Sequence, residues 1–481
     1  MSIRGRLSGL FSVVFKGRDE FDLTSGGIGK PLFYLSLPIV ITNLLQTAYN
    51  LADTFWLGQY STEALAAISF AFPMVFLLIS LGIGLSTAGS ILVAQNTGAG
   101  DDEAAEYAAS QTVTFSLLVS VALGVVGYFG VGPLLAVLGA SADVLPLATE
   151  YMQVISLGLP FMFGFFIFIS LMRGYGDTVT PMLVMFGTVV FNIVLDPFLI
   201  FGWGPFPALG VEGAAVATVV SRGLAMVVGM AIMFAGTRGV EIHLADMRPD
   251  PVYLGKIVKL GVPASIEGTG RAVSVNALLL IVGLFPTTVV AAFGIGIRVF
   301  SVIFMPAIAV ARGVETMAGQ NIGAGEEDRA AATSRFAAKT MFVVLGAAGV
   351  VTWVFAPAVV GVFTPDPEVV EVGATFLRYV APSFAFIGVM RSYTGGFRGA
   401  GKTLTAAVIA VGMLGVVRLP VAWFASQDVG LGLGSSGIWL SFLVSNVLGA
   451  ILAYAWYQRG TWRGADVARG PKETYTATDD D

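Results

Sequence analysis

Long apolar blocks recur along nearly the whole chain, and short polar or Gly- and Pro-containing breaks separate them. An apolar helix crosses the hydrocarbon core of a bilayer in about 20 residues, or more if it is tilted. Twelve blocks reach this length, and the second, seventh and eighth are long enough to project from the membrane. We therefore predict an all-α integral membrane protein with twelve transmembrane helices at residues 31–57, 64–93, 108–132, 146–172, 179–204, 211–236, 254–284, 288–318, 335–359, 370–397, 403–426 and 433–458.

In the connections and tails of this predicted topology, Lys and Arg lie on one side only. The odd-numbered connections, near residues 58–63, 133–145, 205–210, 285–287, 360–369 and 427–432, contain neither, and the second connection, near 94–107, also has none. The other even-numbered connections with their flanks, and the two tails, carry Arg173, Arg238, Arg248, Lys256, Lys259, Arg329, Arg335, Arg398 and Lys402, and Arg4, Arg6, Lys16, Arg18, Lys30, Arg459, Arg463, Arg469 and Lys472. Because basic residues are retained in the cytoplasm, we expect both termini there and a multi-pass protein of the plasma membrane.

The two halves of the chain repeat each other at a constant spacing. Residues 95–103 (QNTGAGDDE) match 320–328 (QNIGAGEED), and residues 173–180 (RGYGDTVT) match 398–405 (RGAGKTLT). Both pairs are offset by 225 residues, as are Pro38 and Pro263. Several matched segments with one offset indicate duplication. Since six helices return the chain to the side where it started, the two copies share one orientation.

The duplication predicts two six-helix lobes related by a pseudo-twofold axis along the membrane normal. We expect an N-lobe at residues 31–236 and a C-lobe at 254–459, joined by a cytoplasmic linker at 237–253. Cytoplasmic segments at 1–30 and 460–481 complete the chain.

The composition supports a membrane protein and excludes several other classes. Apolar residues make up 56% of the chain and charged residues 12%, whereas soluble domains carry roughly a quarter charged residues. Cysteine is absent, which excludes disulfides and thiol chemistry. The one histidine, His243, falls in the linker and is interpreted as a solvated loop side chain. No acid, base or metal cluster suits an enzyme or needs a cofactor, and no basic stripe suits nucleic acid.

Ionisable groups inside a hydrophobic span are costly and mark candidate sites. Asp53 in the first span and Asp196 in the fifth are the clearest cases, and Asn192 shares the helix face of Asp196. The directions of the helices place Tyr151 and Thr218 at the same depth, in the outer half of the N-lobe. Such an oxygen-rich cluster suits a hard cation such as Na⁺, or proton uptake by neighbouring carboxylates.

A structural alternative is that these carboxylates pair with Arg222, one turn from Thr218. The repeat restricts the coupling hypothesis to the first half, because Asp53 corresponds to Leu278 and Thr218 lies opposite Phe442.

The second half carries charges of its own. Glu267 and Arg271 are four residues apart in the favourable order, which predicts an ion pair within one helix. Arg312 and Glu315 are expected to pair near the cytoplasmic end. A substrate role for Glu267 is the alternative.

The first predicted helix contains further candidates. Pro38 removes a backbone hydrogen bond and is a candidate hinge, roughly four turns from Asp53. Gln46 and Tyr49 precede Asp53 by about two turns and one turn, and we expect them to line a substrate cavity.

Five groups of residues resemble the multidrug and toxic compound extrusion (MATE) family: residues 52–58 (ADTFWLG), the two Gln-Asn-x-Gly-Ala-Gly copies, the two Arg-Gly-x-Gly-x-Thr copies, 192–197 (NIVLDP) and 213–218 (GAAVAT). The resemblance covers nearly the whole chain and is closest to the prokaryotic and archaeal branch with an N-lobe cation site. It implies two lobes around a V-shaped cavity.

By this resemblance the cation site, for Na⁺ if that is the ion, falls on Asp53, Asn192, Asp196 and Thr218, with Tyr151 in its hydrogen-bond network. Gln46 and Tyr49 match cavity-lining positions and Pro38 the bending proline. The chain departs from branches with carboxylates in the seventh and tenth helices, because Glu267 sits about one turn too early.

The resulting hypothesis is a monomeric secondary transporter that exports amphipathic, often cationic, organic compounds in exchange for Na⁺ or H⁺ by alternating access. The main alternative is a flippase for lipid-linked oligosaccharides or similar lipid-like cargo. Arg271, Arg298 and Arg391 favour that alternative, whereas the acidic cluster argues against it.

Overall fold

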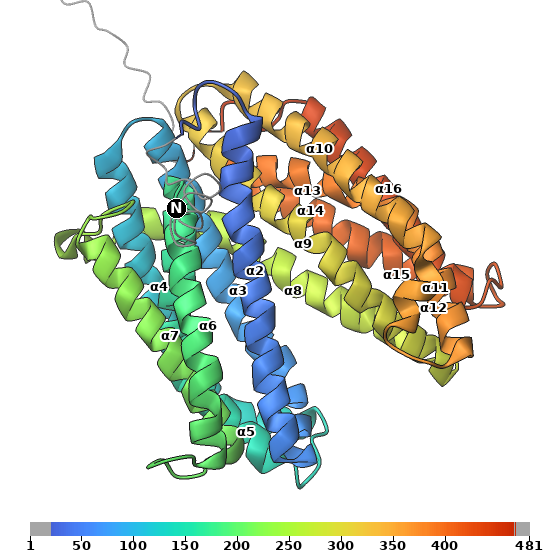
Figure 1. The fold of residues 1–481 in the computed structure, drawn as a ribbon. Helices are drawn as coiled ribbons and strands as arrows, with labels where there is room; N and C mark the ends of the chain where they lie inside the picture. The colour runs from blue at the N-terminus through green and yellow to red at the C-terminus, as the bar shows by residue number, and fades with distance from the viewer. Residues whose placement is uncertain (1–20, 466, 468–481) are drawn as a thin grey trace, which may run out of the picture.

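In a computed structural model, which describes residues 21–465 and 467, the chain is a bundle of helices, and the described residues contain no strand (Figure 1). The first six long helices are α2 (Gly29–Tyr60), α3 (Thr62–Gly98), α4 (Asp102–Val137), α5 (Leu145–Tyr175), α6 (Val179–Phe201) and α7 (Gly210–Phe234). The second half contains α8 (Pro251–Val282), α9 (Thr287–Gly323), α10 (Glu327–Val354), α11 (Ala356–Gly361), α12 (Pro367–Val380), α13 (Phe384–Gly399), α14 (Thr403–Val411), α15 (Leu419–Ser426) and α16 (Ser435–Gln458).

Singly or in continuous runs, the described helices form twelve spans that are long and apolar enough to cross a membrane, which confirms the predicted number. The tenth span runs from α12 through a short 3-10 turn into α13. The eleventh consists of α14, a π-helical segment η4 (Gly412–Arg418) and α15.

Several helices extend beyond the apolar blocks that predicted them. α3 continues to Gly98, so that the first Gln-Asn motif lies in its last turn and not in a loop. α4 begins at Asp102, where the Asp101 side chain accepts a hydrogen bond from the backbone N–H of Ala104 at 3.0 Å. Hydrophobicity marks only the apolar part of a span, whereas capping and first-turn acids let the helix continue.

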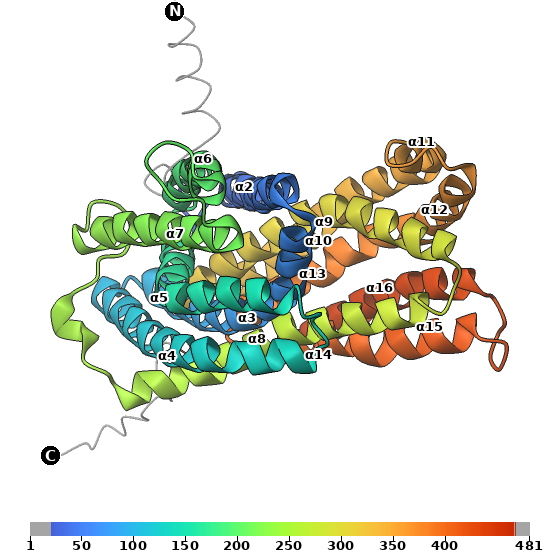
Figure 2. The same cartoon turned by 90° about the horizontal axis from the view of Figure 1, so that it is seen from below.

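The two halves of the sequence form two groups of helices (Figures 1 and 2). Helices α2–α7 form the N-lobe group and α8–α16 the C-lobe group, each with its own clusters of buried apolar side chains. The groups approach each other at the end where α2 begins and diverge towards the end where α2 finishes (Figure 1). The domain boundaries stay predictions, and the terminal segments before residue 21 and beyond residue 467 lie outside the described residues.

The hydrogen bonds between the lobes occur as symmetry-related pairs. The Gln95 side-chain amide donates to the Gly399 carbonyl at 2.9 Å, and the Gln320 amide donates to the Gly174 carbonyl at 3.0 Å. Each pair becomes the other when 225 is added to the N-lobe residue and subtracted from the C-lobe residue. This reciprocal pattern is what a pseudo-twofold axis between the lobes requires.

The entry segment of each lobe is held by the opposite lobe. Before α2, the carbonyl of Leu23 accepts hydrogen bonds from Asn321 at 3.0 Å and from Arg329 at 3.3 Å. Before α8, the Gln111 side chain on α4 donates to the carbonyl of Arg248 at 2.7 Å and accepts from the backbone N–H of Asp250 at 3.0 Å. Each lobe therefore forms hydrogen bonds to the segment that leads into the other lobe, at the end where the lobes meet.

Glycine makes the closest approach of the lobes sterically feasible. A Cβ on Gly98 would overlap the backbone of Gln320, and a Cβ on Gly323 would overlap the backbone of Gln95. Backbone atoms cannot move aside as a flexible side chain can. These two positions therefore require glycine when the lobes meet as they do in this structure.

Replacing Gly323 with alanine is expected to cost about 1–3 kcal/mol of overpacking and to separate the lobes at this end. Scanning fluorimetry should show a lower melting temperature, and spin labels placed across the junction should move apart. Gly130→Ala is the matched control, because nothing lies within 4 Å of its added Cβ. Equal behaviour of the two variants would contradict the close packing of the lobes.

Candidate functional site

The structure brings the five predicted coupling residues together from four helices of the N-lobe. Asp53 lies on α2, Tyr151 on α5, Asn192 and Asp196 on α6, and Thr218 on α7. All five are buried, and Asn192 and Asp196 are completely so.

Direct contacts join Asp53, Asn192, Asp196 and Thr218 into one cluster. Tyr151 lies across the adjacent cavity and forms no hydrogen bond among the described residues, so its predicted place in the hydrogen-bond network is not observed. The Asn192 amide donates to Asp196 Oδ1 at 3.2 Å, and the Tyr49 hydroxyl donates to Thr218 Oγ1 at 2.8 Å. Asp53 interacts with the Asp196 carboxyl group and with the Thr218 hydroxyl. Two acidic groups therefore share one buried site.

Three oxygen atoms of this cluster have no hydrogen-bond donor among the described residues. They are Asp53 Oδ1, Asn192 Oδ1 and Asp196 Oδ2. Nearly all buried polar atoms in proteins have a partner, so three such atoms in one cluster make it a candidate site for a bound species. Their chemistry fits a small hard cation, which oxygen ligands prefer, or protons shared between the carboxyl groups.

Arg222 does not neutralise the carboxylates by a direct ion pair. Its guanidinium group donates to Gln46 Oε1 at 2.8 Å and lies 4.5 Å from the centre of the Tyr49 ring. Within the described part of the chain, neither Asp53 nor Asp196 has a basic nitrogen within 4.0 Å. The structural alternative of an Arg222–Asp ion pair is therefore wrong.

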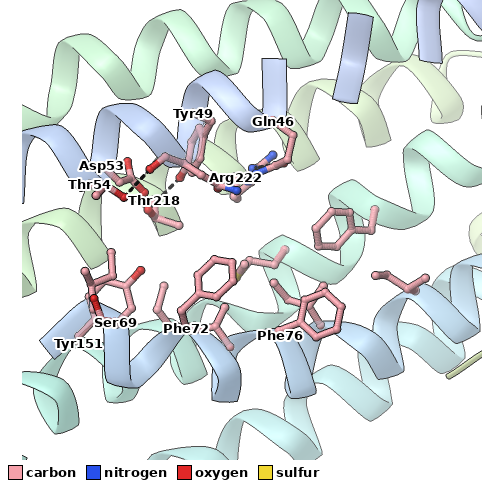
Figure 3. A pocket seen from close by; sticks show the side chains of 18 residues that line it. Gln46, Tyr49, Asp53, Thr54, Ser69, Phe72, Phe76, Tyr151, Thr218 and Arg222 are labelled. Atoms are coloured by element: carbon pink, nitrogen blue, oxygen red, sulfur yellow. Dashed lines mark hydrogen bonds between the residues drawn. The ribbon is translucent and has the colours of Figure 1, made fainter. Parts of the chain in front are cut away.

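A cavity of about 420 Å³, called the N-lobe cavity below, lies beside the cluster (Figure 3). Asp53, Tyr49, Gln46, Thr218 and Arg222 line one wall, and Tyr151 lies opposite with Ser69, Phe72 and Phe76 of α3 (Figure 3). Asn192 and Asp196 are not in the lining. Asp53 is thus the carboxylate that connects the cavity to the buried cluster.

Pro38 lies inside the first half of α2, and the Thr42 hydroxyl bonds to its carbonyl at 2.9 Å. Its role as a hinge stays a prediction. The wall formed by α3 had no signal in the sequence, because Phe72 and Phe76 look like any lipid-facing aromatic residues until the helices are packed.

A second set of buried charges lies where the lobes meet. Glu315 on α9 is paired with Arg312 at 2.9 Å and with Arg398 at 2.9 Å, and Arg173 of the N-lobe approaches it at 3.9 Å. The predicted Arg312–Glu315 pair is confirmed, and the network includes an arginine from each copy of the Arg-Gly-x-Gly-x-Thr motif.

The predicted pair between Glu267 and Arg271 is wrong. Glu267 is paired with Arg391 at 3.4 Å and with Arg398 at 3.1 Å, both from α13. The Arg271 side chain instead lies 5.9 Å from the centre of the Phe304 ring. Spacing along one helix cannot reveal that another helix supplies two guanidinium groups to the same carboxylate.

Removing the Glu315 carboxylate leaves Arg312 and Arg398 without their shared partner. Because breaking a buried ion pair costs about 3–5 kcal/mol, Glu315→Gln should lower the melting temperature strongly. Glu371→Gln on the exposed face of α12 is the control and should have little effect. A Glu315→Gln protein as stable as the control would show that the network contributes nothing to folding.

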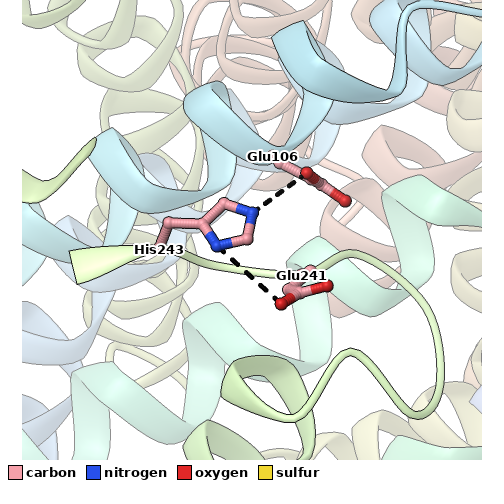
Figure 4. Close-up of side chains that lie close together, drawn as sticks. All are labelled: Glu106, Glu241 and His243. Atoms are coloured by element: carbon pink, nitrogen blue, oxygen red, sulfur yellow. Dashed lines mark hydrogen bonds and ion pairs between the residues drawn. The ribbon is translucent and has the colours of Figure 1, made fainter. Parts of the chain in front are cut away.

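His243 in the linker is half-exposed, as predicted, but it is not isolated (Figure 4). Its Nε2 lies 3.2 Å from Glu106 Oε2 on α4, and its Nδ1 lies 3.8 Å from Glu241 Oε1. The contact with Glu106 joins the linker to the N-lobe.

The geometry defines a class of protein: a two-lobed membrane transporter with a cavity beside a buried acidic cluster. The MatE family profile matches residues 38–198 and again residues 263–424. The chain belongs to this family, the MATE multidrug efflux transporters, whose members are transporters rather than enzymes.

Curated relatives extend over almost the full chain. The probable multidrug resistance protein YpnP of Bacillus subtilis is 30% identical, over 92% of this chain and 98% of the relative. A protein of Shewanella oneidensis named FAD transporter is 28% identical, over 92% of this chain and 97% of the relative.

Solved structures of the family share the architecture. A MATE crystal structure in the bent conformation has a TM-score of 0.85 at 26% identity, covering 91% of this chain and 96% of the other. A multidrug resistance MATE transporter in an outward-facing conformation has a TM-score of 0.84 at 25% identity, covering 93% of this chain and 98% of the other.

Proposed function

We propose that this protein is a secondary active multidrug exporter in which Na⁺ or H⁺ enters the N-lobe cluster and drives export by alternating access. The observation that carries the proposal is the set of three buried oxygen atoms without donors, immediately behind the wall of the N-lobe cavity.

The orientation follows from the distribution of basic residues. With both termini in the cytoplasm of a plasma-membrane protein, the tight contacts of Gln95 and Gln320 close the cytoplasmic end. The diverging ends of the lobes then face outward, which is the state that releases cargo and takes up the ion.

Asp53 connects ion binding to cargo binding because it belongs to both the cluster and the cavity wall. An ion between Asp53 and Asp196 neutralises the carboxylate that faces the cavity and so weakens its hold on a cationic compound. The ion drives transport only if its affinity differs between the outward- and inward-facing conformations. Pro38 in α2 is the proposed hinge for this change.

The lining of the N-lobe cavity favours amphipathic organic cations. Asp53 supplies negative charge, and the rings of Tyr49, Tyr151, Phe72 and Phe76 supply apolar area and faces for cation–π contacts. Cargo chemistry varies among relatives, since one is named a FAD transporter. Lipid-linked oligosaccharides remain the second candidate cargo, favoured by the arginines of the C-lobe.

The test uses proteoliposomes with Na⁺ and pH gradients imposed separately and a fluorescent organic cation as cargo. Asp53→Asn and Asp196→Asn each remove one ionisable group, so gradient-driven transport should fall to the rate seen without a gradient. Asp143→Asn, in an exposed loop between α4 and α5, is the matched control and should transport like the wild type. Full gradient-driven transport by both cluster variants would refute coupling at this site.

A further inference from the structure

The C-lobe contains its own cavity, of about 330 Å³, here called the C-lobe cavity. It is the duplicate of the N-lobe cavity, because five lining positions of the two cavities correspond at the offset of 225. The corresponding pairs are Ile68 and Phe293, Phe72 and Ile297, Val75 and Phe300, Ile79 and Phe304, and Ile83 and Ile308. One ancestral chamber therefore exists twice in this molecule.

The two chambers have diverged in charge. Asp53 of the N-lobe cavity is replaced by Leu278 in the C-lobe cavity, Gln46 by Arg271, and Phe166 by Arg391. Arg418 adds a third guanidinium group, and no Asp or Glu is part of the lining. The lining of the N-lobe cavity thus carries one carboxylate, Asp53, and one guanidinium group, Arg222, whereas the lining of the C-lobe cavity is basic.

Aromatic and neutral polar groups hold these arginines. The Arg418 guanidinium lies 4.2 Å from the centre of the Phe442 ring and donates to Ser445 at 2.9 Å and to Asn446 at 2.8 Å. Arg271 and Arg391 lie 5.9 and 5.0 Å from the centre of the same Phe304 ring.

Carboxylates neutralise only part of this charge. Arg391 reaches Glu267 at 3.4 Å but shares that carboxylate with Arg398, and its Nε has no acceptor among the described residues. No ion pair within 4.0 Å joins Arg271 or Arg418 to an acidic side chain in the described part of the chain. Burying guanidinium groups without counter-charges is unfavourable, and an anionic ligand would remove that cost.

We infer that the C-lobe cavity is a binding site for an amphipathic organic anion, with a carboxylate, sulfonate or phosphate group among Arg271, Arg391 and Arg418 and an apolar body against the phenyl rings. The volume is within the range of small-molecule sites. Guanidinium groups suit oxyanions because they offer paired N–H donors. The site goes beyond the proposed function and does not depend on ion coupling at Asp53.

The experiment measures binding without any gradient, by calorimetry on the full chain in nanodiscs of zwitterionic lipid. The probes share a naphthalene ring and differ in charge: naphthalene-2-sulfonate, the neutral naphthalene-2-methanol and the cationic naphthalene-2-methylammonium. Each probe is titrated alone. We expect the sulfonate to bind at least ten-fold more tightly than the neutral probe, because one hydrogen bond to a charged group contributes about that much affinity. Adding phosphatidylglycerol to the nanodiscs separates the two sources of anion: competition with the sulfonate identifies an anionic lipid as a ligand of the same site, and no competition restricts the site to soluble anions.

Variants locate the site. Arg271→Gln should weaken sulfonate binding about ten-fold, and Arg271→Lys should restore part of it because the charge is kept. Arg298→Gln is the matched control, since Arg298 is an exposed arginine of the same lobe outside the lining. Asp53→Asn should leave sulfonate binding unchanged while abolishing coupled transport. Ion coupling at Asp53 and anion binding in the C-lobe cavity can therefore be refuted independently of each other. The inference is overturned if all three probes bind alike, or if a folded Arg271→Gln protein binds the sulfonate like the wild type.

Discussion

Burying charge away from water dominates this structure, because each ionised group in the membrane interior must find a partner or a ligand. The described residues show three outcomes. At the junction of the lobes Glu315 forms ion pairs with Arg312 and Arg398. In the N-lobe cluster three oxygen atoms have no donor among the described residues, and in the C-lobe cavity Arg271 and Arg418 have no carboxylate within 4.0 Å in the same part of the chain. The ion-paired set lies where the lobes meet, whereas the other two sets are places where a ligand would supply the missing partner.

Duplication explains why these sets occur where they do. The scaffold residues, such as Gln95 and Gln320, have kept their identity and their reciprocal contacts in both copies. The chamber residues were free to diverge, because the packing of the lobes does not depend on them. Asp53 and Leu278 occupy equivalent positions, but Asp53 places a carboxylate in its cavity wall and Leu278 places an apolar side chain there. A pseudo-symmetric scaffold therefore carries two chemically different sites.

The sequence was sufficient for the fold, because lipid imposes a length on every apolar span and the repeat has a constant offset. It also located the acidic cluster, since Asp53 and Asp196 are conspicuous in otherwise apolar helices. It failed where contacts come from distant helices. The partners of Glu267 lie on α13, and the wall of the N-lobe cavity lies on α3, and neither follows from spacing along one helix. Arg222 near the carboxylates was visible, but its preference for Gln46 and Tyr49 was not.

The exchanged entry segments have a consequence for the history of the chain. The segment before α2 is bound by the C-lobe, and the linker before α8 is bound by the N-lobe. Two separate six-helix chains with the same contacts would form a homodimer by trading their N-terminal arms, which is a low-cost route to a symmetric dimer. Fusion of two such chains converts one arm into the internal connection and leaves the other at the N-terminus. The present chain therefore has the architecture of an arm-swapped dimer whose subunits became covalently joined.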